Sequence, residues 1–280
     1  MQFKEYSHAK DVLARVGPML EKREVQHNLP LGVLRQLERE RDPDCFLAVG
    51  ERDGEPVSVM IQTPPRKLII CGKQDAMKET AEWMYQVKPD LNGVIGCSDS
   101  AEAFTRAWTE ISGAASEPVR RQVIFRLDKV KEFDRPQGKL TYANEDDFEL
   151  VMSWTEEFAL GSMRASDLER LEETVMQEIK HNQVFLWRDQ YCTPVSMAKR
   201  ARELTNGIVV NYVYTPEEYE RQGFATACVG ALSERLLKEG YRFCSVNTND
   251  DHEASQSVYK KLGYEPVGSA IEFSYTTSVT

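Results

Sequence analysis

The sequence predicts a mixed α/β protein of two domains, in which helices flank a sheet. Three observations support this prediction. Segments with helical spacing of apolar residues alternate with short strand-like segments, the second half of the chain repeats the order of the first, and 280 residues suit two domains. Domains usually contain roughly 100–200 residues, so the length alone favours two.

The first half begins with two helical patterns, marked by apolar residues on one face: Val12, Leu13, Val16 and Leu20, then Leu31, Leu34 and Leu37. A β-hairpin follows over 45–64, where Asp53-Gly54 supplies the turn. The remaining segments alternate between strand and helix: strand over 67–72, helix over 76–87, strand over 91–97, helix over 100–112 and strand over 121–130.

Residues 133–138, with the sequence FDRPQG, separate the two halves by charge, proline and glycine. We therefore predict an N-terminal domain over 1–134 and a C-terminal domain over 139–280. The second half again predicts helices before strands: helices over 146–160 and 165–182, strands over 184–190, 193–204 and 207–215, then helix 225–240, strand 242–249, helix 253–263 and strand 270–277. Two hairpin-like segments echo each other across the halves, CFLAVGERDGEPVSVM and VFLWRDQYCTPVSMA.

The composition excludes several classes of function. The chain carries 45 acidic and 35 basic residues, a net charge of −10, without a block of like charges, which argues against nucleic acid as a partner. Its apolar runs are too short to span a membrane, and its N-terminus lacks the apolar core of a signal peptide, so we expect a cytoplasmic location. The six cysteines form no CxxC pair and the four histidines no HExxH motif, which predicts buried thiols and no metal site.

The segment Val213–Thr226, VYTPEEYERQGFAT, joins a strand that is apolar on both sides of Asn211 to an amphipathic helix. The first N–H groups of a helix lack intrahelical partners and carry a partial positive charge, so an anion fits there. Gly223 removes a side chain from the approach to the backbone, and Arg221 adds a cation. The segment alone nevertheless favours a plain tight turn, because it contains neither GxGxxG nor GxxxxGK[ST].

A second segment changes this interpretation. VYTPEEYERQGFAT resembles the acyl-CoA-binding motif of the GNAT superfamily of N-acetyltransferases, and HEASQSVYKKLGYEPVG is similar to the downstream segment of the same superfamily. The resemblance covers the second domain. It implies a GNAT-like fold, with a mixed and mostly antiparallel sheet flanked by helices. It also implies transfer of an acetyl or other acyl group from acetyl-CoA (coenzyme A), without a metal, to the primary amine of a small molecule or peptide by direct attack in a ternary complex.

The resemblance assigns roles residue by residue. It implies that acetyl-CoA is bound by the strand end and the turn: Val213, Tyr214, Thr215, Arg221, Gln222, Gly223, Phe224, Ala225 and Thr226. The resemblance also implies that His252, which stands where the superfamily usually has Asn, contributes to the acetyl-CoA site. Glu220 stands where the superfamily usually has Arg or Gln. Tyr259 matches the usual general acid. The general base is expected to be Glu156 or Glu157, with Glu217, Glu218 and Asp250 as alternatives.

The first domain has no counterpart of this turn, because Gly72 is followed by Lys73-Gln74-Asp75. We predict a GNAT-like domain without a cofactor motif that supplies one wall of the acceptor site, to which Trp83, Tyr85 and Trp108 either contribute or belong to the core. A non-catalytic acyl-CoA-binding or protein-interaction module is the alternative, and the acidic balance argues against a transferase that uses aminoacyl-tRNA. The acceptor is not fixed by the sequence, and a homodimer is left open.

Overall fold

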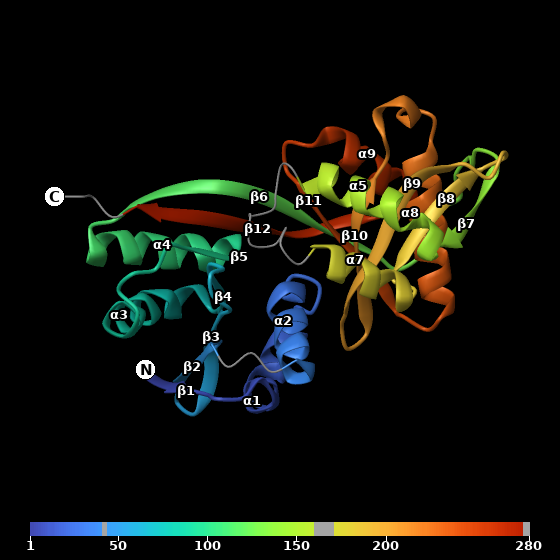
Figure 1. Cartoon of the computed structure of the whole chain (residues 1–280). Coiled ribbons are helices and arrows are strands. Elements are labelled where there is room, and N and C mark those ends of the chain that lie inside the picture. Colours follow the sequence, from blue (N-terminus) through green and yellow to red (C-terminus); the bar gives the residue numbers. More distant parts are fainter. Residues whose placement is uncertain (41–43, 160–170, 277–280) are drawn as a thin grey trace. The chain divides into compact units, whose positions relative to one another are not determined.

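A computed structural model of the chain describes residues 1–40, 44–159 and 171–276 (Figure 1). The predicted class is confirmed: mostly antiparallel strands form a sheet that helices flank. The chain divides into two compact units. The first unit comprises Met1–Ile124, Asn247–Asp251 and Pro266–Thr280, and the second comprises Phe125–Val246 and His252–Glu265. The domain limits 1–134 and 139–280 stay a prediction.

The strands of the first unit follow the order β1-β2-β3-β4-β5-β12-β6. Only β4 and β5 are parallel among the pairs described from β1 to β12. The elements are β1 (Gln2–Glu5), α1 (Ala9–Glu21), α2 (Asn28–Arg39), β2 (Phe46–Arg52), β3 (Glu55–Gln62), β4 (Leu68–Gly72), the 3-10 turn η1 (Gln74–Ala76), α3 (Met77–Val87), β5 (Gly93–Cys97), α4 (Ser98–Ser112), β6 (Ala115–Leu127, here up to residue 124) and β12 (Glu265–Thr276, here from residue 266).

The predicted hairpin is confirmed. β2 and β3 pair from Arg52 and Glu55 outward, and the turn residues Asp53 and Gly54 have φ angles of 52° and 77°. Two successive positive φ angles define the tight turn that matches the twist of the flanking strands, and Asp-Gly adopts it readily.

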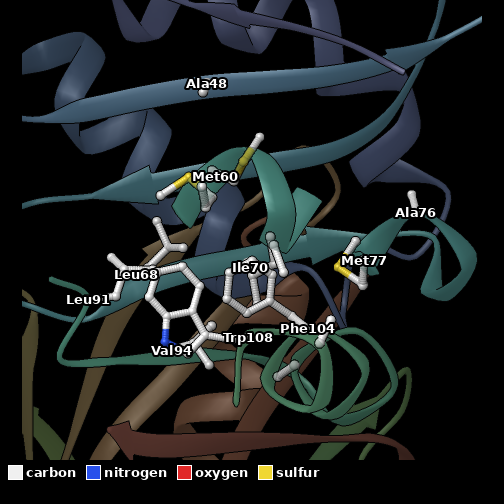
Figure 2. Packing of buried hydrophobic residues seen from close by; sticks show 14 of the residues in the cluster. Ala48, Met60, Leu68, Ile70, Ala76, Met77, Leu91, Val94, Phe104 and Trp108 are labelled. Atoms are coloured by element: carbon white, nitrogen blue, oxygen red, sulfur yellow. The ribbon is translucent and has the colours of Figure 1, made fainter. Parts of the chain in front are cut away.

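One face of the first unit's sheet is covered by α3 and α4. Ala48, Met60 and Ile70 lie opposite one another in register and pack against Phe104 and Trp108 of α4. Figure 2 shows the Trp108 indole beside Leu68 and Val94.

Of the three aromatic residues expected either to line an acceptor wall or to belong to the core, Trp108 is a core residue, Trp83 is partly buried and Tyr85 is exposed. Trp108 is 1% exposed and stacks on Phe104 and Tyr275. Trp83 stacks on Phe3 with 4.8 Å between ring centroids, and the ring of Tyr85 meets Trp108 edge-on. Aromatic residues at helical spacing are large apolar surfaces, and the core role is clear for the buried Trp108.

The strands of the second unit follow the order β11-β10-β9-β8-β7, and only β10 and β11 are parallel among these described pairs. Residues 165–170 of the helix predicted over 165–182 lie outside the described residues, and the described part of that range contains α7. The elements are β7 (Gly138–Tyr142), η2 (Glu145–Asp147), α5 (Phe148–Ala159), α7 (Leu171–Lys180), β8 (Val184–Asp189), β9 (Pro194–Glu203), β10 (Gly207–Tyr214), η3 (Glu217–Tyr219), α8 (Phe224–Lys238), β11 (Phe243–Asn249) and α9 (Glu253–Leu262).

Two sets of helices pack on this second sheet. Helices α5 and α7 bury Trp154, Val175 and Ile179 against Leu186 of β8 and Met197 of β9. Helix α8 packs on β8, β9 and β10 through its own apolar stripe, which includes Cys228 and Leu232.

The prediction of buried thiols holds for Cys71, Cys97, Cys228 and Cys244, which are free and buried, while Cys192 is exposed.

Candidate functional site

The parallel strands β10 and β11 separate before β10 ends. Their described pairs run from Gly207 opposite Phe243 to Val209 opposite Ser245, whereas β10 continues to Tyr214. Backbone N–H and C=O groups must find hydrogen-bond partners wherever they are buried. The end of β10 therefore offers backbone groups on the edge that no longer pairs with β11 in the described ladder.

A β-bulge reshapes the other edge of β10 at the same level. Asn211 pairs with Lys199 and Tyr214 with Met197, so two residues of β10 lie opposite one residue of β9. Tyr212, the first of the two, has a φ angle of 50°, and its N–H donates to the Asn211 Oδ1 at 2.8 Å. Bulges re-aim the backbone and side chains next to them, and they are frequent beside active sites.

A serine of β9 forms hydrogen bonds with the end of β10. The Ser196 Oγ donates to the Tyr214 carbonyl at 3.1 Å, and the Thr215 Oγ1 donates to the Ser196 Oγ at 2.9 Å. Among the strand-end groups predicted to contact acetyl-CoA, the Tyr214 carbonyl is thus already bonded within the protein. Ser196 was missed from the sequence, although a hydroxyl inside the apolar strand TPVSMA is a signal that could have indicated it.

The turn before α8 ends in backbone amides without intrahelical partners. Arg221 and Gly223 have φ angles of 59° and 84°, while Gln222 between them does not have a positive φ. Alternating handedness of this kind aims successive N–H groups at one point, a geometry that binds anions. The first intrahelical bond runs from the Ala227 N–H to the Gly223 carbonyl at 2.9 Å, which leaves the N–H groups of 224–226 without intrahelical partners.

Gly223 keeps this turn open. A Cβ built at Gly223 would meet only the Cδ of Pro136, at 3.7 Å, which is an ordinary contact distance. Arg221 is exposed and is the one cation in the described segment 213–226. The Gln222 amide donates to the Glu218 carbonyl at 3.0 Å, so that side chain is used inside the turn. The backbone and Arg221 therefore carry the positive potential, and the exposed carboxylate of Glu220 opposes it.

The structure brings one predicted base to the end of β10. The Tyr214 hydroxyl donates to the Glu157 carboxylate, which also accepts from the Ser153 Oγ at 3.2 Å. The Trp154 ring packs on the Tyr214 ring, with 5.9 Å between centroids. Burial and the hydrogen bond to Glu157 raise the pKa of Tyr214, so this phenol keeps its proton at neutral pH. Glu156 is exposed and, about 100° away around the helix, does not share the face of Glu157.

Tyr259 lies among buried aromatic rings, and His252 caps the N-terminus of α9. Tyr259 is 5% exposed, and its ring packs on Phe125 and Tyr264 at centroid distances of 5.9 and 5.7 Å. Burial raises the pKa of Tyr259, so it too holds its proton at neutral pH. The His252 Nδ1 accepts from the Ser255 N–H at 3.2 Å and so caps the N-terminus of α9. This cap requires an unprotonated Nδ1.

Comparison with known proteins identifies proteins of similar fold. Residues 194–271 match the family model described as FR47-like protein. An acetyltransferase from the GNAT family of Colwellia psychrerythraea is 12% identical, with a TM-score of 0.63 over 99% of this chain and 100% of that chain. A GCN5-related N-acetyltransferase from Sphaerobacter thermophilus is 15% identical, with a TM-score of 0.65 over 97% of this chain and 94% of that chain. A tandem GNAT protein from the clavulanic acid biosynthesis pathway is 11% identical, with a TM-score of 0.60 over the full length of both chains. A search of curated proteins finds no match.

The chain therefore has the fold of the GNAT acetyltransferases along its whole length, and the resemblance inferred from two motifs is confirmed. In the described part of the chain, no helix combines the length and apolarity needed to cross a membrane. The same residues contain no group of three or more His, Cys, Asp or Glu side chains arranged to hold a metal ion.

Proposed function

We propose that this protein is an N-acetyltransferase that transfers the acetyl group of acetyl-CoA to a primary amine by direct attack in a ternary complex. The observation that carries the proposal is the open row of amides at Arg221–Thr226, which follows a strand that has separated from its parallel neighbour. Such a row suits the pyrophosphate of coenzyme A. In this proposal the C-terminal domain over 139–280 is catalytic, and the N-terminal domain over 1–134 is a GNAT-like domain without a cofactor site.

Each group of the chain has a defined task in the reaction. Acetyl-CoA supplies an activated acyl group as a thioester. Glu157 accepts a proton from the ammonium of the acceptor, which frees the lone pair for attack. A backbone N–H at Val213 or Thr215 stabilises the negative charge that develops on the acyl oxygen, an effect worth roughly 3–4 kcal/mol for one donor. Tyr259 donates a proton to the departing thiolate as the carbon–sulfur bond breaks, and the second proton of the amine returns through water to the Tyr259 oxygen.

Binding and turnover are tested separately. Calorimetry with acetyl-CoA measures binding, and a thiol-release assay with a panel of primary amines measures transfer. We expect heat of binding and amine-dependent thiol release. Absence of binding heat would contradict the proposal, and binding without release on any amine would favour the non-catalytic acyl-CoA-binding module. The use of His252 as a helix cap is the observation that keeps this second candidate open.

The base is tested with two neighbouring carboxylates. Glu157→Gln should lower kcat by roughly a hundredfold to ten-thousandfold, the usual range for loss of a general base. Glu156→Gln is the matched control, one position along the same helix, and should leave kcat nearly unchanged. Tyr259→Phe should lower kcat while acetyl-CoA binding stays intact. A fall in kcat for Glu156→Gln alone would assign the base to Glu156 instead.

A further inference from the structure

A buried lysine lies under the bulge of β10. Lys199 of β9 is 2% exposed, and its Nζ donates to the Glu178 Oε2 at 2.7 Å and to the Thr155 Oγ1 at 3.1 Å. Burial lowers the pKa of the Lys199 ammonium, and the Glu178 carboxylate opposes that shift. The reaction proposed above uses none of these three side chains.

The ammonium also contacts the residue that begins the bulge. The Lys199 Nζ lies 4.3 Å from the centroid of the Tyr212 ring, within the range of a cation–π interaction. The same ring packs on Phe158 of α5 at a centroid distance of 4.9 Å. Lys199 pairs in register with Asn211, the last residue before the bulge. The Lys199 ammonium and the Phe158 ring are therefore among the contacts of the Tyr212 ring at the point where the ladder breaks.

Tyr212 needs such support because of its backbone conformation. A non-glycine residue in the left-handed region costs about 1–2 kcal/mol, and it persists only when its surroundings fix it. Stability alone gives little reason for a lysine here, since a buried ion pair is often no better than apolar residues of similar volume. A role in directing the backbone accounts for both the left-handed conformation of Tyr212 and the burial of Lys199.

We propose that the Lys199–Glu178 pair positions the acyl-transfer site. The ammonium, held by Glu178 and Thr155, fixes the Tyr212 ring, and the ring fixes the bulge that sets the direction of the backbone at Val213, Tyr214 and Thr215. Lys199 is thus a positioning residue that acts through Tyr212. The kinetic part of this inference rests on the proposed function, whereas its structural part does not.

The test removes the pair without leaving a charge unpaired. In Lys199→Met/Glu178→Met, hydrogen–deuterium exchange should rise roughly tenfold in a peptide covering residues 210–216. The acetyl-transfer kcat/KM should fall roughly tenfold to a hundredfold, because small displacements of reacting groups cost that much. Thermal melts verify that the variant is folded. Lys199→Arg keeps a cation at this position and should keep exchange in the same peptide near that of the parent.

A second, partly buried ion pair of the same unit is the matched control. The Arg188 Nη2 donates to both carboxylate oxygens of Asp147, at 2.6 and 2.7 Å. In Arg188→Met/Asp147→Asn this pair is lost, while the amide oxygen can still accept from the Asn144 N–H, as the Asp147 carboxylate does at 3.0 Å. This control should lower the melting temperature but leave exchange in 210–216 and the kinetic constants unchanged.

Combined substitutions at Tyr212, Lys199 and Glu178 test whether Lys199 acts on the backbone through the Tyr212 ring. Tyr212→Phe keeps the ring and should therefore disturb exchange in 210–216 less than Tyr212→Leu does. Tyr212→Leu removes the ring and should raise exchange in 210–216 by itself, and adding the Lys199/Glu178 changes should then have little further effect. Unchanged exchange in the Lys199→Met/Glu178→Met protein, or equal effects of the two double variants, would overturn the inference. Absence of acetyl transfer in the parent would refute the proposed function, and the exchange comparison would still decide the role of Lys199.

Discussion

Two strand-to-helix turns of this chain begin alike and differ in what faces their glycine. The turn from β4 to α3 and the turn from β10 to α8 each follow a strand that pairs in parallel with the next strand. A glycine with positive φ stands at the start of the first turn, where Gly72 ends β4, and at the end of the second, where Gly223 precedes α8. A Cβ at Gly72 would lie 2.2 Å from the Val57 carbonyl oxygen, whereas at Gly223 the nearest atom is 3.7 Å away. The missing side chain serves close packing in the first turn and leaves open space in the second.

The two turns also differ in length. Residues 73–76 connect β4 to α3, while residues 215–223 connect β10 to α8. In the short turn, the Lys73 N–H donates to the Val57 carbonyl at 2.8 Å, so its backbone is tied to β3. The long turn has room for Arg221 and Gly223 in the left-handed region. A strand followed by glycine and a helix therefore indicates an anion site only when the backbone before the helix is not already bonded to the sheet.

The largest effect is expected at Gly72. Gly72→Ala forces a Cβ against the Val57 carbonyl, which requires a backbone shift and should lower the free energy of unfolding by about 3 kcal/mol. Gly113→Ala is the matched control, because Gly113 also has positive φ but no atom within 4 Å of its Cβ position, so it should cost only about 1 kcal/mol. Denaturant unfolding measures both values. Equal losses would show that close packing does not distinguish Gly72.

At Gly223 the effect should fall on binding rather than on stability. Gly223→Asn places a side chain in the open space, while asparagine tolerates the left-handed conformation. We expect the affinity for acetyl-CoA to fall at least about tenfold and the free energy of unfolding to change by less than about 1 kcal/mol. Calorimetry and denaturant unfolding give the two numbers. Undiminished affinity would remove the turn from the proposed site.

The smallest effect concerns acid sensitivity of the first unit. Burial lowers the pKa of His27. For Glu272, burial raises the pKa, but Lys67 and Arg120 outweigh it and the net shift is downward. A group whose pKa is lowered on folding contributes stability above its unfolded pKa, and this contribution is lost as pH falls. The loss should begin near pH 6.5 for His27 and below about 4.5 for Glu272.

Hydrogen exchange between pH 7 and 4 should therefore show first-unit peptides losing protection before those of the second unit. Glu272→Gln removes the titrating carboxylate and should flatten the lower part of this dependence. Simultaneous loss of protection in both units would contradict the expectation.

Local signals in the sequence predicted much of this fold. Asp53-Gly54 identified the hairpin, because two positive φ angles suit few other dipeptides. The turn at Gly223 was singled out by glycine and small residues between a strand and a helix, but by itself this segment favoured a plain tight turn, and only the resemblance of two segments to GNAT motifs implied an anion site. Glu157 was named together with Glu156, and the sequence did not distinguish them. The hairpin and the turn depend on neighbours in the sequence, so a single sequence carries them.

Features that depend on distant partners were not predictable. The left-handed Tyr212 is held by Lys199 and Phe158, and nothing in the segment GIVVNYVYT indicates a bulge. Lys199 is one of several charged residues in the segment SMAKRAREL, and the sequence does not distinguish it from the others. Only the fold shows that it is buried. The assignment of residues 266–280 to the first unit likewise rests on contacts such as the Lys67 Nζ to the Ser274 Oγ, 207 positions apart.

The last strand has a consequence for synthesis of the protein. β12 pairs with β5, Ile271 and Tyr275 belong to the first unit's core, and the Thr105 and Tyr275 hydroxyls lie within hydrogen-bond distance, at 2.8 Å. Domains usually fold in the order in which the ribosome releases them. Here the unit that is synthesised first lacks a strand and part of its core until residues 266–276 emerge, when residues 125–246 of the second unit are already outside. The first unit to leave the ribosome is therefore the last to be completed.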